Sequence, residues 1–315
     1  MKHFLVRIFL FCVPLIIVAI GCEIFVRTMP SSYKQKRDQL IANADSIEIL
    51  VMGSSHAMDG IDPNQFALYT HNLAFGAQSI YFDRRIVEKY LSDLPRLKYV
   101  LLNLEFNSLY FDHDEGRDFF YKYYYDLDYK NRKFYKESFL QFFFVYTPEE
   151  TLSQMINRIK SIRSAKSAKS RQEGLFKGWH GSAGRNDEKV TSDEANKIRA
   201  KGFNDTAKEW KGGDSVLIDL EALITLLQSH KITPVLVAYP NYSLMRSYLD
   251  PSIIERNQSI ANKLSEKYQI PYLDYFDDDS FTVADYFNCD HLNAAGAAKL
   301  SKKINAAIMD LEAKK

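Results

Sequence analysis

The chain has 315 residues, of which 46% are hydrophobic, and its formal net charge is +1 at neutral pH. This length fits one large domain or one domain with an insertion, and the apolar content is ample for a core. The balanced charge argues against a nucleic-acid partner. Only Cys289 lies beyond the N-terminal apolar segment, so the sequence excludes a disulfide within the domain.

The N-terminus has the pattern of a membrane anchor. Lys2, His3 and Arg7 precede a run from Ile8 to Val26 that is almost wholly apolar. Such a run is long enough for one helical crossing of the hydrocarbon core. We therefore predict a transmembrane anchor over residues 1–28.

Two alternatives to an uncleaved anchor remain open. A cleaved signal peptide has similar features, but this run is long and lacks a convincing cleavage site of small residues. A lipoprotein signal is suggested by Ala19-Ile20-Gly21-Cys22, although apolar residues resume soon after Cys22. We favour a single-pass membrane protein whose body lies on the extracytoplasmic side, in the periplasm or at the cell surface. The basic residues after the span weaken this orientation, but large domains translocate largely regardless of such charge.

Short apolar strands alternate with helical segments along much of the remaining chain. After a polar stalk at 29–45, the pattern predicts a domain over 46–315, with an insertion at about 110–213. The expected class is α/β: a three-layer α/β/α sandwich with a parallel sheet, because strands and helices alternate at short spacing. We expect strands ending at 55, 76, 104, 240 and 275, and helices over 79–94, 214–230, 251–268 and 293–311.

The segment at 110–213 has no such alternation. It begins with aromatic groups at 119–125 and 142–146, and continues with a basic run at 158–171. The aromatics indicate a lid, a groove for sugar rings or lipid, or an inserted helical subdomain with its own core. The basic run fits a solvated helix face or a surface near anionic headgroups.

Two small motifs at opposite ends of the domain suggest nucleophilic catalysis. Gly53-Ser54-Ser55 follows the first strand, where glycine allows a sharp turn that exposes a serine hydroxyl. His291 precedes the closing helix. A serine nucleophile needs a base within hydrogen-bond reach, and His291 is the candidate. The Gly-x-Ser-x-Gly elbow is absent because Ala57 stands at its second glycine.

These motifs resemble those of the SGNH (GDSL-type) hydrolase family. Gly53-Ser54-Ser55 matches the first family block, with Ser54 in place of the usual aspartate, and Gly76 matches the second. Asn107 corresponds more weakly to the third, and His291 matches the fourth. The resemblance covers about 46–109 and 214–311. It implies that Ser55 is the nucleophile and His291 the base. It also implies that the Ser55 amide, the Gly76 amide and the Asn107 side chain bind the oxyanion.

The acid of the family pattern is replaced in this chain. Asn288 stands three residues before His291, where the family has aspartate. Asn288 could still orient the imidazole, but it would stabilise an imidazolium less. Asp290 and Asp285 are alternatives. Because adjacent side chains normally point apart, we rank Asp290 below Asn288 on geometry, although its charge could contribute.

The single span and the Gly-Ser-Ser block are similar to the membrane-anchored branch that includes DltD and the alginate O-acetylation proteins. This resemblance implies acyl transfer through an acyl-serine to an exported polysaccharide or other glycan. The acyl donor would act through a membrane-bound O-acyltransferase, with no cofactor. A carbohydrate esterase or deacetylase is the second hypothesis. A catalytically inactive glycan-binding or assembly protein is the third.

Other residues of interest have weaker signals. His56 and Tyr110 are expected to lie near the substrate. His180, in a loop-like Gly-Trp-His-Gly stretch, is expected to be solvated. The acidic run at 277–279 has no partner at metal-ligand spacing, so we expect an exposed turn and no metal site.

Overall fold

The computed structural model describes residues 2–28, 31–112, 118–127, 152–153, 155–157, 160, 177–179, 181 and 187–314. The chain divides into two compact units. The first comprises Met1–Gln35 and Asp114–Gly174, and the second comprises Lys36–His113 and Leu175–Lys315. The expected candidate residues that the structure describes all lie in the second unit, and His180 lies outside the described residues.

The first unit contains the N-terminal apolar helix, α1 (Lys2–Arg27). Its 26 residues correspond to about 39 Å of helix, which exceeds the ~30 Å hydrocarbon core of a bilayer. Most of its large apolar side chains are exposed. Near its end, Arg27 Nε donates to Glu23 Oε1 at 2.6 Å, so the only acidic group of the span is paired. The helix is long and apolar enough to cross a membrane, and an N-terminal signal sequence would have the same properties.

The first aromatic group of the sequence forms a packed cluster in the same unit. Helix α5 (Asp118–Tyr125) places three aromatic rings around Tyr33, which lies at the start of α2 (Ser32–Ala42). The ring centroids of Phe120, Tyr121 and Tyr124 lie 4.8, 5.4 and 6.4 Å from that of Tyr33. The second aromatic group, at 142–146, lies outside the described residues. The same holds for the basic run at 158–171 apart from Lys160.

The second unit is built on a parallel five-stranded sheet, which confirms the predicted class. The strand order is β2-β1-β3-β4-β5, and every neighbouring pair is parallel. The strands are β1 (Ile49–Val51), β2 (Thr70–Asn72), β3 (Tyr99–Asn103), β4 (Thr233–Ala238) and β5 (Tyr272–Asp274). The order reverses between β1 and β3, and ligands bind at such a switch point in open α/β sheets.

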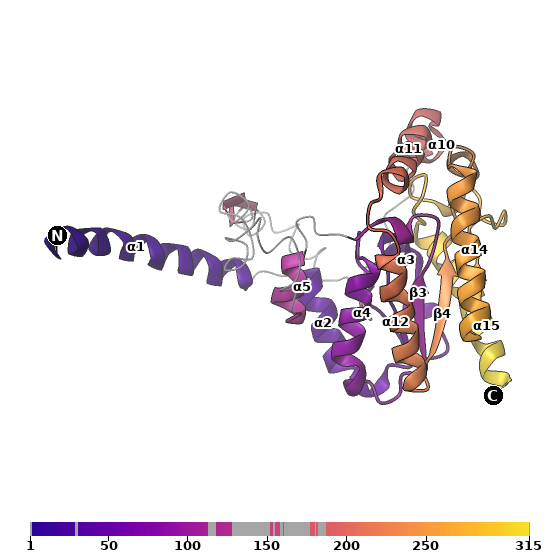
Figure 1. The fold of residues 1–315 in the computed structure, drawn as a ribbon, viewed down its shortest axis with the longest axis horizontal. Helices are drawn as coiled ribbons and strands as arrows, with labels where there is room; N and C mark the ends of the chain where they lie inside the picture. The colour runs from indigo at the N-terminus through magenta and orange to yellow at the C-terminus, as the bar shows by residue number, and fades with distance from the viewer. Residues whose placement is uncertain are drawn as a thin grey trace. The chain divides into compact units, whose positions relative to one another are not determined.

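Helices cover both faces of this sheet, as right-handed crossovers between parallel strands require. On one face, α3 (Ser55–Gly60) contacts the closing helix α15 (Ala294–Ala313). On the other face, α4 (Ile80–Tyr90) and α12 (Ser215–Ser229) lie side by side along the strands (Figure 1). Helix α14 (Pro251–Tyr268) joins α12 through an ion pair between Lys267 and Glu221.

The core follows from the two-residue period of the strands. Ile49 and Val51 of β1 share one buried cluster with side chains of α3 and α15. Leu50 points to the opposite face because side chains alternate along a strand. Both faces of β1, β3 and most of β4 are buried, as expected for a parallel sheet. The remaining elements are α10 (Asp187–Thr191), α11 (Asp193–Glu209), α13 (Ser243–Arg246) and 3-10 turns at Ala44–Ser46, Pro63–Gln65, Leu91–Asp93, Ser108–Tyr110 and Val283–Asp285.

Most predicted elements agree with the structure, but the second strand does not. It was expected over 72–76, whereas β2 covers Thr70–Asn72 and the residues that follow form a loop. The strand is polar in sequence yet fully buried, because its side chains have local partners. His71 Nε2 lies 3.3 Å from the Lys36 carbonyl. Asn72 Nδ2 donates to the carbonyls of Ala57 and Ile61. The first strand also ends earlier than expected, so that Ser55 begins α3.

Two helical glycines predict opposite effects of the same substitution. A Cβ on Gly296, at the start of α15, would lie 2.2 Å from the Asp285 carbonyl oxygen. Gly202 in α11 has no atom within 4 Å of that position. We expect Gly296→Ala to lower the free energy of unfolding by about 2–3 kcal/mol through overpacking. Gly202→Ala should raise it by ~0.5–1 kcal/mol because alanine favours the helix. Thermal denaturation of the full chain in detergent measures both, and equal effects would contradict this packing.

Candidate active site

The candidate nucleophile lies where β1 ends at the switch point of the sheet. Gly53 has φ +124°, and a Cβ there would lie 2.4 Å from Cβ of Asn103 at the end of β3. Only glycine therefore allows this close approach of the two strand ends. Ser54 is the N-cap of α3, and Ser55 is its first residue. The Ser55 amide belongs to the first helical turn, whose N–H groups have no acceptor within the helix.

The structure brings Ser55, His291 and Asp290 into one hydrogen-bonded row. His291 Nε2 lies 2.8 Å from Ser55 Oγ, and its Nδ1 lies 3.0 Å from Asp290 Oδ1. An ionised carboxylate only accepts hydrogen bonds, so Nδ1 carries the proton that faces Asp290. Nε2 is then free to accept the Ser55 proton. This is the arrangement that serine nucleophiles require.

Asn288 also approaches His291, but its carbonyl oxygen already has two other donors. Asn288 Oδ1 lies 3.1 Å from His291 Nδ1, and it accepts the backbone N–H groups of His291 at 2.8 Å and Asp290 at 3.1 Å. A carbonyl oxygen has two lone pairs, which these two amides use. The charged oxygen of Asp290 is the stronger acceptor for Nδ1. The expectation that Asp290 points away from its neighbour is therefore wrong for this loop. Asn288 shapes the turn that brings Asp290 to the imidazole.

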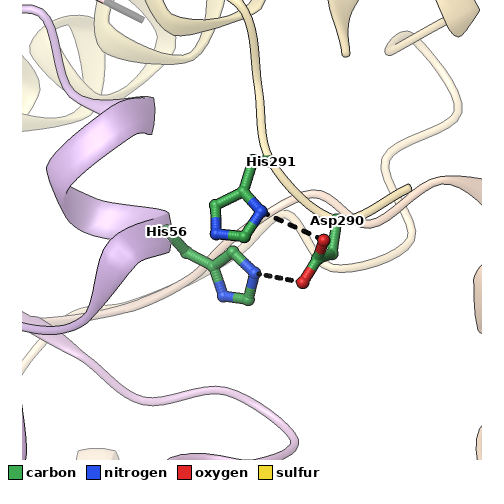
Figure 2. A group of neighbouring side chains, drawn as sticks. All are labelled: His56, Asp290 and His291. Atoms are coloured by element: carbon green, nitrogen blue, oxygen red, sulfur yellow. Dashed lines mark hydrogen bonds and ion pairs between the residues drawn. The ribbon is translucent and has the colours of Figure 1, made fainter. Parts of the chain in front are cut away.

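Asp290 is a buried carboxylate with three cationic or polar neighbours. Its side chain is 1% exposed. Besides His291, its Oδ2 accepts from Arg199 Nε at 2.6 Å and lies 3.4 Å from His56 Nε2 (Figure 2). Burial alone would raise the pKa of Asp290, but the charge and hydrogen bonds of His291 and His56 hold it well below the usual value. Asp290 is thus ionised at neutral pH.

The loop that carries His291 is anchored on both sides. Phe287 N donates to the His291 carbonyl at 2.8 Å. Asn293, the N-cap of α15, accepts two amides of the helix and donates to the carbonyls of Ala284 and Tyr286. These bonds explain the Asn293 that follows His291 in the sequence. They keep the imidazole in place without using its ring nitrogens.

A pocket of about 250 Å³ opens beside Ser55. Asn107, one expected oxyanion donor, lines it, and Asn107 Oδ1 is buried without a partner in the described part of the chain. The neighbour of Gly76, Ala77, also lines the pocket with a left-handed φ of 56°. Such a conformation costs alanine about 1–3 kcal/mol and is concentrated at functional sites. Gly76 itself is not among the lining residues.

The loop between β2 and α4 that contains Gly76 is fastened by a buried lysine. Lys36 is fully buried, and its Nζ donates to the Ala74 carbonyl and lies 4.5 Å from the centre of the Phe75 ring. Burial lowers the pKa of Lys36 to about 7, although Asp59 opposes this change. Lys36 therefore links the stalk-derived helix α2 to the expected oxyanion loop.

Other expected residues lie away from the pocket. Tyr110 is buried, with its hydroxyl donating to Asn257 Oδ1 at 3.0 Å and accepting from Arg256, and it is not a lining residue. Its neighbour Phe111 lines the pocket instead. Asp285 forms a capping box with Thr282 and an ion pair with Lys299, so it serves the loop rather than His291. His180 lies outside the described residues.

Arg199 was not expected at this site. It comes from α11, inside the stretch expected as an insertion, and it lines the pocket with its guanidinium 4.4 Å from the ring centre of Phe203. Glu105, in the loop after β3, was likewise not expected at the site, yet its Oε1 lies 2.6 Å from His56 Nδ1. A charged residue on a polar helix face is common, so no sequence pattern distinguishes Arg199.

His56, Asp290 and His291 also have residue types and spacing that could hold a metal ion. Their other contacts fit a hydrogen-bonded network better. Arg199 occupies Asp290 Oδ2 at 2.6 Å and would face the metal as a second cation. His56 directs its other nitrogen to Glu105. A divalent ion would have to displace Arg199 and the proton shared by His291 and Asp290.

Comparisons with known proteins leave the family unassigned. No protein-family model matches the chain. No curated protein matches it significantly. Among solved structures, it is similar to a candidate acylhydrolase from Bacteroides fragilis NCTC 9343, with 12% identity and a TM-score of 0.43 over 90% of this chain and 99% of that one. This likeness is too distant to support a conclusion about activity.

The geometry predicts that Asp290 and Asn288 differ in what they supply. In Asp290→Asn, the amide can donate to Nδ1 and favour the tautomer whose Nε2 carries a proton and cannot accept one from Ser55. We expect phosphonylation of Ser55 by a fluorophosphonate to slow about 10³–10⁴-fold. Asn288→Ala keeps the carboxylate and loses the backbone hydrogen bonds that shape its turn, so it should slow labelling by only about tenfold. Rates from intact mass spectra decide between them, and the reverse order would make Asn288 the orienting group.

Proposed function

We propose that this protein transfers or hydrolyses acyl groups through an acyl-serine formed on Ser55. One observation carries the proposal: the hydroxyl of Ser55, both nitrogens of His291 and the carboxylate of Asp290 form one row of hydrogen bonds beside an open pocket. A buried, ionised acid at one end and a serine at the strand end fit acyl transfer.

In the first step, Ser55 Oγ attacks the carbonyl carbon of an acyl donor and passes its proton to His291 Nε2. Asp290 stabilises the imidazolium that forms. The amide of Ser55, the backbone at Gly76–Ala77 and the side chain of Asn107 would bind the developing oxyanion. The tetrahedral intermediate then expels the donor's leaving oxygen, which takes the proton from Nε2.

In the second step, His291 Nε2 removes the proton of a hydroxyl that attacks the acyl carbon. The second tetrahedral intermediate then breaks its bond to Ser55 Oγ, which takes the proton back from Nε2. Water as acceptor gives hydrolysis, and a sugar hydroxyl gives O-acyl transfer. The two reactions share the acyl-enzyme and differ only in the acceptor. We favour transfer to a polysaccharide or other glycan of the cell envelope. The apolar α1 and the resemblance to membrane-anchored SGNH proteins support this choice. The acyl group would come from a membrane-bound O-acyltransferase.

Two alternatives lead to different products or to none. A carbohydrate esterase or deacetylase would use the same groups with water as acceptor. A catalytically inactive glycan-binding protein was suggested by the missing family acid at 288. The position of Asp290 weakens that argument, because a carboxylate does reach Nδ1.

The proposal predicts an acyl adduct on one serine. We expect the full chain in detergent, mixed with an activated acetyl ester, to gain the mass of one acetyl group. Ser55→Ala should gain none, because it lacks the attacking oxygen. His291→Ala should acylate about 10⁴–10⁶-fold more slowly, because no base accepts the proton. Intact mass spectrometry with peptide mapping measures each outcome.

Competition between acceptors separates the alternatives. Adding a neutral oligosaccharide at rising concentration should divert acetyl from water to sugar if the protein is a transferase. A constant rate of acetate release without acetylated sugar would indicate an esterase. A folded wild-type chain that forms no adduct with either the ester or a fluorophosphonate would leave only the binding hypothesis.

A further inference from the structure

A second histidine lies directly beside the proposed triad. His56 follows Ser55 in sequence, and its side chain is only 3% exposed. Its Nδ1 lies 2.6 Å from Glu105 Oε1, and its Nε2 lies 3.4 Å from Asp290 Oδ2. The ring centre is 4.8 Å from that of His291, with the planes tilted by 43° (Figure 2). The reaction steps above assign it no task.

The surroundings of His56 require a doubly protonated ring. A neutral imidazole has one N–H and one lone pair, and here that lone pair would face a carboxylate oxygen. Only the imidazolium donates to both neighbours. Burial opposes this charge, but the carboxylate of Glu105 and the hydrogen bonds of Asp290 and Glu105 raise the pKa of His56 to about 10. His56 is therefore a fixed cation at neutral pH.

Glu105 is the group that makes this cation stable. Its side chain is fully buried. Oε1 is shared between His56 and Asn103 Nδ2, the latter at 3.1 Å. Oε2 has no hydrogen-bond partner in the described part of the chain. A buried carboxylate with so few donors needs a counter-charge, and His56 is the closest one.

The His56 cation restrains the side chain of Asp290. Adjacent side chains usually point apart, so an acid that immediately precedes its histidine needs a restraint. Oδ2 of Asp290 is fixed by Arg199 on one side and by His56 on the other, and this leaves Oδ1 directed at His291 Nδ1. Arg199 is 43% exposed, whereas His56 is buried, so water screens the charge of His56 less.

We infer that His56 is a positioning residue, a buried imidazolium held by Glu105 that keeps Asp290 in line with His291. This inference rests on the proposed acyl-serine function. It explains how an adjacent acid can replace the acid three residues earlier in the family pattern. His56 transfers no proton in the reaction, because both of its protons face carboxylates.

The charges of His56 and Glu105 act in opposite directions on the protonation of His291, and so on the pH–rate profile. The groups that face His56 are Glu105 after β3, Asp290 and His291 before α15, and Asp59 of α3, with Arg199 of α11 on the far side of Asp290. The positive charge of His56 disfavours protonation of His291, the base, whereas the negative charge of Glu105 favours it. At this distance in a buried site, removal of the His56 charge alone should move the acid limb by about one pH unit or more.

The variants His56→Gln and Glu105→Gln test the inference on the full chain in detergent. We expect kcat for acetyl-ester turnover to fall at least about tenfold in His56→Gln, with KM little changed, because Asp290 loses its alignment. Its acid limb should move to higher pH, whereas that of Glu105→Gln should move less, because His56 loses its charge together with Glu105. If Glu105 acts through His56, its substitution should cost less in the His56→Gln background than alone.

His71→Gln is the matched control, since His71 is a buried histidine on β2 whose burial lowers its pKa to about 3. It should leave the acid limb in place whatever it does to stability. A His56→Gln enzyme that loses only thermal stability, with the wild-type acid limb, would overturn the inference.

A measurement on the wild type keeps the test independent of catalysis. With ¹⁵N-labelled histidine, NMR of the full chain should show His56 with both nitrogens protonated from pH 6 to about 9. The resonances are assigned by their loss in His56→Gln. A neutral ring at pH 7 would overturn the inference even if Ser55 forms an acyl adduct. A charged ring in a chain that forms no adduct would instead locate the failure in the proposed function.

Discussion

One buried carboxylate, that of Asp290, connects the parts of the chain that make the site. It contacts its own neighbour His291 in the loop before α15, His56 on α3 after β1, and Arg199 on α11. An isolated buried carboxylate would be costly, and these partners remove most of that cost. The partners come from three separate parts of the chain: His56 follows β1, Arg199 lies between β3 and β4, and His291 follows β5. The ionised state of Asp290 and the convergence of these segments therefore depend on each other.

Backbone geometry alone already brings together the segments that carry Ser55 and His291. Parallel strands deliver their carboxyl ends to one edge, and Gly53 allows β1 to approach Asn103 at the end of β3. At the other side of the site, Gly296 lets α15 start against the Asp285 carbonyl, which fixes the loop that carries His291. At both positions a Cβ would collide with a neighbouring segment, so glycine is required. They place the nucleophile and the base within hydrogen-bond distance, and Asp290 then orients the base.

Much of this fold could be predicted from the sequence, because apolar strands and amphipathic helices have clear periods. Helix α14 begins and ends where its proline and its apolar spacing indicated. Strand β2 was expected too late in the sequence, since the apolar residues at 73–75 lie in the loop that follows it, whereas Thr70 and His71 are polar and buried. Ser55 and His291 were identified by position at element ends. Arg199 was missed because its role depends on tertiary contacts that helical spacing does not reveal.

Asp290 shows that a carboxylate can orient the histidine even where the spacing of the family motif is not kept. In the family that the sequence resembles, the acid stands three residues before the histidine. Here Asn288 accepts the backbone amides of Asp290 and His291, which turns the chain back on itself. That turn brings two adjacent side chains together, which an extended backbone would keep apart. The charge can then come from Asp290, provided that cations on its outer oxygen hold it there. Asn288 therefore shapes the loop while Asp290 supplies the charge, and the asparagine at 288 is not by itself a sign of lost catalysis.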